Sequence, residues 1–123
     1  MKIASPILAA CLFALLGCSP PAAPADPEKA RTALRAALEA WAEGEKMDSL
    51  LGRSPAIHVA DEDWQKGWTL KKFDIAAQDE QLGQQRRIGV KLSLNSPQGK
   101  AVDKQVRYEI DTSPKLVIVR TFE

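Results

Sequence analysis

The apolar residues of this 123-residue chain change their spacing part-way along the sequence, from a helical period to an alternating one. Between residues 27 and 43 they recur every three or four positions, as on one face of a helix. The residues of this stripe are Ala30, Leu34, Ala37, Leu38 and Trp41. From residue 68 onward the spacing is mostly two, which is typical of half-buried strands. The order of the two patterns predicts an α+β fold in which a helix precedes a sheet.

The expected long helix has a clear start and a clear stop. Asp26 offers an N-cap side chain, Pro27 occupies the first helical position, and Glu28 places an acid in the first turn. Gly44 ends the helix. A second, short helical turn is expected around residues 48–51.

Four strands are expected after these helices. Residues 88–94 and 105–111 alternate between apolar and polar side chains. Residues 68–75 change parity, which a β-bulge near Lys71 and Lys72 would reconcile, so we expect a curved sheet. Residues 116–122 are apolar on both parities and should lie centrally in the sheet or be covered on both faces. Turn signals separate the strands, among them Gly83 and Gly99.

A long amphipathic helix followed by a four-stranded antiparallel meander resembles the cystatin-like and NTF2-like α+β architecture, in which a curved sheet wraps the N-terminal helix. The resemblance rests on the order of the elements and not on a family motif. It implies a fold but no particular activity, because such folds host enzymes, ligand carriers and interaction modules. A strand-edge or helix-hairpin arrangement is the alternative.

The first residues form a secretory leader, with Lys2 ahead of an apolar stretch that ends at residue 16. The ending Leu15-Leu16-Gly17-Cys18 resembles the lipobox of bacterial lipoproteins, which implies cleavage before Cys18 and acylation of its thiol. The alternative is later cleavage, after the A-x-A sequence of residues 23–25. We therefore expect a signal peptide at residues 1–17, a Pro/Ala tether at 18–26 and a single domain at 27–123. Ser19, where an aspartate would signal retention in the inner membrane, favours the outer membrane.

Cleavage before Cys18 changes what the chain can do chemically. Cys11 leaves with the leader and Cys18 is acylated, so no thiol remains for a disulfide, a metal site or nucleophilic catalysis. Loss of Lys2 leaves 16 basic residues against 16 acidic ones. Such a balance gives no electrostatic case for binding nucleic acid or anionic lipid head groups. The expected attachment to the membrane is through covalent lipid.

Six residues are candidates for the lining of a pocket. They are His58, Arg120, Tyr108, Trp41, Trp64 and Trp68. For the single histidine a packing role is favoured over catalysis, and for the tryptophans a role as core anchors is favoured over a pocket wall. Arg120 resembles the charged groups that point into NTF2-like cavities. Its alternative is an ion pair with Glu109 or Asp111 on the neighbouring strand.

The acidic run 61–63 has two interpretations. It can be read as a hard-cation site, but it lacks the spacing and the distal Glu of a calcium loop. We expect instead that Asp61 opens a short helical turn that ends at Gly67, and we predict no metal site and no cofactor.

No P-loop, GxGxxG, HExxH, GxSxG or CxxC motif is found in the sequence, so an enzyme is the weaker class. The leading hypothesis is a non-catalytic, lipid-anchored envelope module that binds another protein or a small ligand. The alternative is an NTF2-like enzyme whose pocket contains His58 and Arg120, with Tyr108 and the tryptophans. A purely structural envelope component is the third hypothesis.

Overall fold

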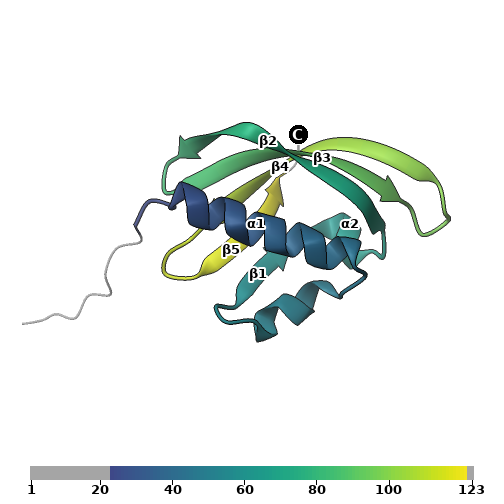
Figure 1. Cartoon of the computed structure of the whole chain (residues 1–123), viewed down its shortest axis with the longest axis horizontal. Helices are drawn as coiled ribbons and strands as arrows, with labels where there is room; N and C mark the ends of the chain where they lie inside the picture. The colour runs from purple at the N-terminus through teal and green to yellow at the C-terminus, as the bar shows by residue number, and fades with distance from the viewer. Residues whose placement is uncertain (1–22, 122–123) are drawn as a thin grey trace, which may run out of the picture.

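The computed structural model describes residues 23–121, in which α1 lies across one face of a curved five-stranded sheet (Figure 1). The sheet order is β1-β5-β4-β3-β2. The described part of the chain therefore has an α+β fold, as predicted. In chain order the elements are α1 (Pro27–Ala42), η1 (Met47–Gly52), β1 (Ile57–Ala60), α2 (Glu62–Gln65), β2 (Thr69–Leu82), β3 (Gln85–Asn95), β4 (Ala101–Asp111) and β5 (Leu116–Thr121).

Helix α1 begins and ends where the sequence predicts. The carboxylate of Asp26 accepts a 3.0 Å hydrogen bond from the backbone N–H of Lys29, which satisfies one of the unpaired donors at a helix start. Gly44, two residues beyond the last residue of α1, has a φ of 86°, a conformation that favours glycine. The apolar stripe faces the sheet, and Leu34 is fully buried. The expected turn around residues 48–51 is present as η1, a 3₁₀ helix.

Strands β2 to β5 form an antiparallel meander, each paired with its neighbour in sequence. The register of β2 against β3 shifts between Leu70 and Lys72, which confirms the predicted bulge. A second shift, between Ile75 and Asp79, was not expected, and β2 extends to Leu82. The sequence pattern stops at Ile75 because the residues after it no longer alternate.

The sheet has five strands, so the expected count of four is wrong. The additional strand is β1, which pairs in parallel with β5, with Val59 opposite Ile118. Its four residues are too few for a period of two to stand out. Strand β5 thus lies between β1 and β4, inside the sheet, which agrees with the first of its two predicted placements.

The core lies between α1 and the inner face of the sheet. Every second residue of β3 from Ile88 to Leu94 is at most 1% exposed, and Tyr108, Ile110 and Ile118 continue this buried face on β4 and β5. Residues 1–22 and 122–123 lie outside the described residues, so the predicted signal peptide, the lipobox and Cys18 do as well. Across residues 23–121, none of the helices is both long and apolar enough to cross a membrane.

Candidate functional site

Asp61 is the N-cap of α2, as the sequence predicts. Its Oδ1 accepts hydrogen bonds from the backbone N–H groups of Asp63, at 3.0 Å, and Trp64, at 3.3 Å. An aspartate at this position is a favourable start for a short helix. Both Asp61 and Asp63 are buried, so their carboxylates depend on partners from the rest of the fold.

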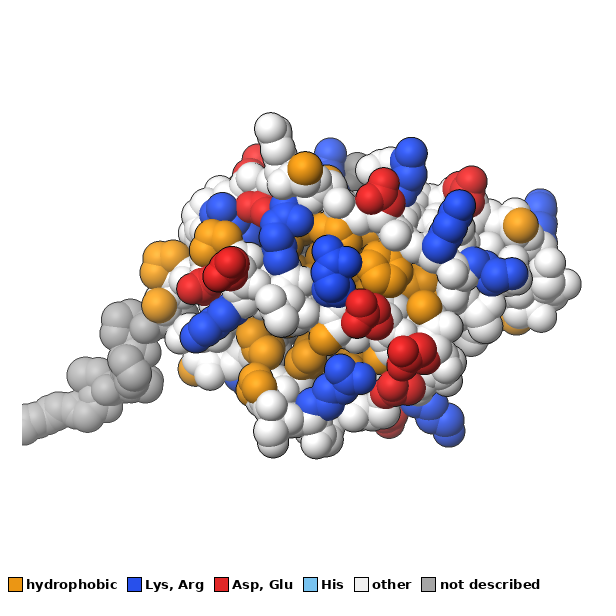
Figure 2. All heavy atoms as spheres, viewed as in Figure 1, with side chains coloured by type: hydrophobic (Ala, Val, Ile, Leu, Met, Phe, Trp, Pro, Cys, Tyr) orange, Lys and Arg blue, Asp and Glu red, His pale blue; other side chains and the backbone are white. Residues whose placement is uncertain are grey.

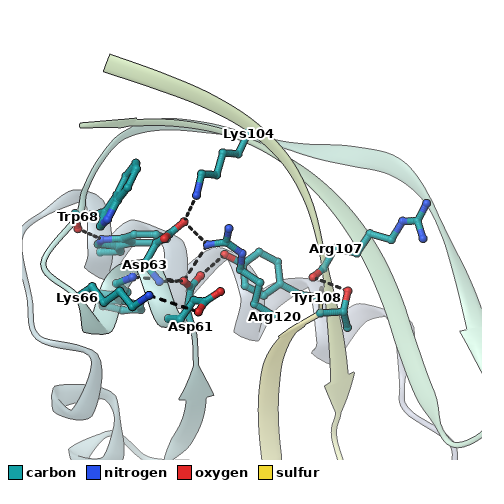
Figure 3. A network of polar contacts seen from close by, with 12 residues as sticks. Asp61, Asp63, Lys66, Trp68, Lys104, Arg107, Tyr108 and Arg120 are labelled. Carbon is teal, nitrogen blue, oxygen red and sulfur yellow. Dashed lines mark hydrogen bonds and ion pairs between the residues drawn. The ribbon is translucent and has the colours of Figure 1, made fainter. Parts of the chain in front are cut away.

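Those partners come from the inner face of β4 and β5 (Figure 3). The hydroxyl of Tyr108 donates a 2.6 Å hydrogen bond to Asp61. Nη1 of Arg120 donates to Oδ1 of Asp61 at 3.0 Å and to Oδ2 of Asp63 at 2.7 Å. Nζ of Lys104 lies 2.8 Å from the same Oδ2 of Asp63. We call these five residues the Asp61 cluster.

The strand register assembles the Asp61 cluster. Tyr108 and Arg120 are direct partners across β4 and β5. Lys104 lies four residues before Tyr108 on β4, so the two side chains share a face. The expectation that Arg120 pairs with Glu109 or Asp111 is wrong, because both acids lie on the opposite face of β4. The carboxylate of Glu109 instead binds Arg87 at 2.8 Å.

Burial and neighbouring charges shift the pKa values of three residues of the Asp61 cluster, Asp63, Tyr108 and Arg120. Burial alone would raise the pKa of Asp63, but hydrogen bonds from Lys104 and Arg120 outweigh it and lower that pKa below its ordinary value. Burial, with the charge of Asp61, raises the pKa of Tyr108 well above its usual value of 10. Burial would lower the pKa of Arg120, but the two aspartates outweigh it and raise that pKa. Two carboxylates thus face two cations, with a neutral phenol between them.

The three tryptophans come together beside the Asp61 cluster. The rings of Trp41 and Trp64 stack with centroids 5.2 Å apart and planes 7° apart. The indole N–H of Trp41 donates to the carbonyl of Trp68 at 2.8 Å, and that of Trp64 donates to the carbonyl of Glu45 at 3.0 Å. The ammonium of Lys104 lies 4.5 Å from the centre of the Trp68 ring, a cation–π contact.

Both sequence interpretations of the tryptophans describe part of this arrangement. Trp41 and Trp64 are buried and act as core anchors, whereas Trp68 is half-buried. All three also line a hollow of about 580 Å³ at the end of α1. Its remaining wall comes mainly from residues 44–48.

His58 is the one candidate that lies elsewhere. It sits on β1, opposite Val117 of β5, and is half-buried. It lines a hollow of about 650 Å³ between α1 and the β4–β5 turn. Arg120 lines a different hollow, of about 510 Å³, together with Asp61 and Lys104. The structure therefore places Arg120 and Tyr108 together, and the tryptophans next to them, but sets His58 apart.

Sequence reasoning did not assign Asp61, Asp63 and Lys104 to a common site with Arg120. The available signal was that Tyr108 and Arg120 are polar positions on otherwise apolar strand faces, which calls for partners. Sequence reasoning also missed Asp79, a half-buried residue whose carboxylate accepts hydrogen bonds from Arg31 of α1 at 2.8 Å and Arg86 of β3 at 2.6 Å. Within residues 23–121, no three His, Cys, Asp or Glu side chains are grouped so as to hold a metal ion.

No protein-family model matches this chain, and no curated protein or solved structure matches it significantly.

Proposed function

We propose that this protein is a lipid-anchored, non-catalytic module of the bacterial cell envelope that binds a protein or a small ligand. The anchor is argued from Leu15-Leu16-Gly17-Cys18, which ends the apolar leader as a lipobox does. Ser19 after the cysteine favours the outer membrane over the inner one. The membrane is then one partner of the chain through its lipid, and an envelope protein is a second candidate.

The hydrogen bonds within the Asp61 cluster support the non-catalytic part of this proposal. Arg120 and Tyr108 are the polar groups that a pocket enzyme would use, yet both direct hydrogen bonds to Asp61. Their pKa values are raised, away from neutrality. A general acid or base is most effective when its pKa is near the working pH. This arrangement suits a cluster that holds α2 against the sheet.

Concave surfaces support the binding part of the proposal. The tryptophan-lined hollow and the hollow at His58 have volumes of about 580 Å³ and about 650 Å³. Small-molecule sites commonly measure roughly 300–1,000 Å³. Both hollows are bordered by α1, whose position on the sheet is held by the buried core.

The finer fold assignment, cystatin-like or NTF2-like, is also a proposal. Its support is the packing of α1 against a bent antiparallel meander of four strands. The alternative function, an NTF2-like pocket enzyme, requires His58 and Arg120 to act on one substrate. Their positions in separate hollows favour the binding module.

Cys18→Ser tests the anchor. We expect the variant to remain unprocessed and to lose the detergent-extractable, lipid-modified form that the parent shows on cell fractionation. A variant processed and fractionated like the parent would contradict the lipoprotein assignment.

Conservative changes in the Asp61 cluster test the absence of catalysis. Tyr108→Phe keeps the ring and removes the hydroxyl, and Arg120→Lys keeps the charge and removes the fork of donors. Each variant is expressed in a deletion strain, and its abundance is measured beside its rescue of growth under envelope stress. We expect rescue in proportion to abundance. Loss of rescue at normal abundance would favour the enzyme.

A further inference from the structure

The hollow at His58 is formed by three segments that are distant in sequence. They are the N-terminal half of α1, residues 53–58, and the β4–β5 turn with the start of β5. In Figure 1 the β4–β5 turn and the start of β1 lie below α1, and in Figure 2 apolar atoms are exposed there with both basic and acidic side chains nearby. Four of the lining residues, Ala33, Ala36, Ile57 and Leu116, belong to the core or pack against it, whereas residues 53–56 and 112–115 are loops.

The floor of the hollow is apolar. Four residues of α1 that follow the spacing of a single helix face line the hollow: Lys29, Thr32, Ala33 and Ala36. The two alanines leave space that longer side chains would fill. Ile57 and Leu116 close the floor from β1 and β5.

The rim of the hollow is basic. Lys29, Arg53 and Lys115 all line it with exposed side chains, and none of the described residues in the lining is acidic. Arg53 has an acidic neighbour outside the lining, with Nη2 3.5 Å from Glu45. Within residues 23–121, Lys29 and Lys115 form no ion pair. The carboxylate of Asp26 also lies outside the lining, where it accepts a 3.0 Å hydrogen bond from the backbone N–H of Lys29. An anion at this rim would therefore meet three cations and no carboxylate among the described residues of the lining itself.

The hollow also lies where the chain enters the domain. The backbone N–H of Asp26 donates a 2.9 Å hydrogen bond to the hydroxyl of Thr112, which is part of the lining. Asp26 follows Cys18 by eight positions. Eight residues span no more than about 29 Å even when fully extended. An acylated Cys18 would thus keep the hollow close to the bilayer, where amphiphiles are concentrated.

We infer that this hollow binds a single-chain amphiphile with an anionic head, of the fatty-acid type, with its head at Lys29 and Lys115 and its chain along the apolar floor. The basic rim disfavours a cationic ligand, and the apolar floor gives an amphiphile an advantage over a small inorganic anion. This inference rests on the proposed binding function and names the ligand class.

The test uses the full chain, purified from membranes and reconstituted into phosphatidylcholine vesicles. Octanoate is titrated by calorimetry, with protein-free vesicles as the reference. We expect saturable binding to one site, with a dissociation constant of about 1 mM or lower. Acetate, which lacks the chain, and octyltrimethylammonium, which has the opposite charge, should each bind about tenfold more weakly or not at all. Octyl phosphate then reports which anionic head the rim prefers.

Two variants identify the site. The double variant Lys29→Glu with Lys115→Glu should weaken octanoate binding about tenfold. The matched control is Lys71→Glu with Lys72→Glu, at exposed positions of β2 outside the hollow, and it should leave octanoate binding unchanged. Ala36→Phe fills the floor without changing charge and should also weaken binding, and circular dichroism checks that each variant is folded.

The inference would be overturned if octanoate showed no saturable binding or if octyltrimethylammonium bound as tightly as octanoate. It would also be overturned if the Lys71/Lys72 control lost as much octanoate affinity as the Lys29/Lys115 variant. The Cys18 and Arg120 experiments do not measure this hollow. Failure of the Cys18 test would remove the anchor and the closeness of the hollow to the bilayer, and failure of the Arg120 test would remove the non-catalytic role. Failure here would remove only the ligand class.

Discussion

The hydroxyl of Tyr108 donates a 2.6 Å hydrogen bond to Oδ2 of Asp61, a residue 47 positions earlier in the chain. The same aspartate caps α2 through its Oδ1. One buried carboxylate therefore both starts a helix and fastens it to the sheet. Because Asp61 is only 2% exposed, water does not replace a partner that is lost.

Removing Asp61 should be costly. Asp61→Ala deletes the cap of α2, leaves the Tyr108 hydroxyl without its acceptor and removes one of the two carboxylates that Arg120 binds, so we expect the free energy of unfolding to fall by about 3–5 kcal/mol. Tyr108→Phe removes one hydrogen bond to a charged group and should cost about 1.5–3 kcal/mol. Urea denaturation measures both. Asp74→Ala, at an exposed position of β2, is the control and should stay within about 0.5 kcal/mol of the parent. A Tyr108→Phe variant as stable as this control would contradict the structural role of the cluster.

Trp41→Ala tests the packing of α1 on the rest of the domain. The ring of Trp41 is 3% exposed and stacks on Trp64, so its removal should cost about 3–5 kcal/mol of unfolding free energy. Thermal and urea unfolding are the measurements. Leu51→Ala, at a residue that is 49% exposed, is the matched control and should change stability little. An unchanged Trp41→Ala transition would mean that this end of α1 is not anchored as described.

Acid should destabilise the domain partly through Asp63. Its pKa in the folded state lies below the ordinary value of 3.8, so the unfolded chain takes up the proton first as the pH falls. The contribution of this group is complete above about pH 4 and is lost as the pH falls through the folded-state pKa. Unfolding free energies from about pH 6 down to about pH 2 should therefore decline less steeply in Asp63→Asn than in the parent. Parallel curves for the two proteins would rule out this role of Asp63.

Local patterns predicted the elements whose signals lie within a few residues. The cap at Asp26 and the stop at Gly44 bound α1, and the parity change at Lys71 marks the first bulge of β2. The start of α2 at Asp61 was predicted for the same reason. Side-chain capping, glycine at positive φ and the two-residue period of a strand are all short-range effects.

Pairing between residues that are far apart in the sequence was not predicted. Strand β1 has four residues and gains its place only from the parallel partner β5. Arg120 was expected to pair with Glu109 or Asp111 on the neighbouring strand, but it reaches Asp61, 59 positions earlier in the chain. The choice among acids depends on which one the folded chain brings to the inner face of β5.

The sequence by itself determined the α+β class, the bounds of α1 and the first bulge, because each follows from local capping, backbone sterics or the spacing of apolar residues. Only the tertiary structure decided that β1 joins the sheet and that Arg120, Tyr108 and Lys104 meet two aspartates. It also decided that His58 faces a basic-rimmed hollow apart from them. These relationships join residues that are far apart in sequence, and burial makes them specific, since a charge removed from water requires whichever partner the packed chain places beside it.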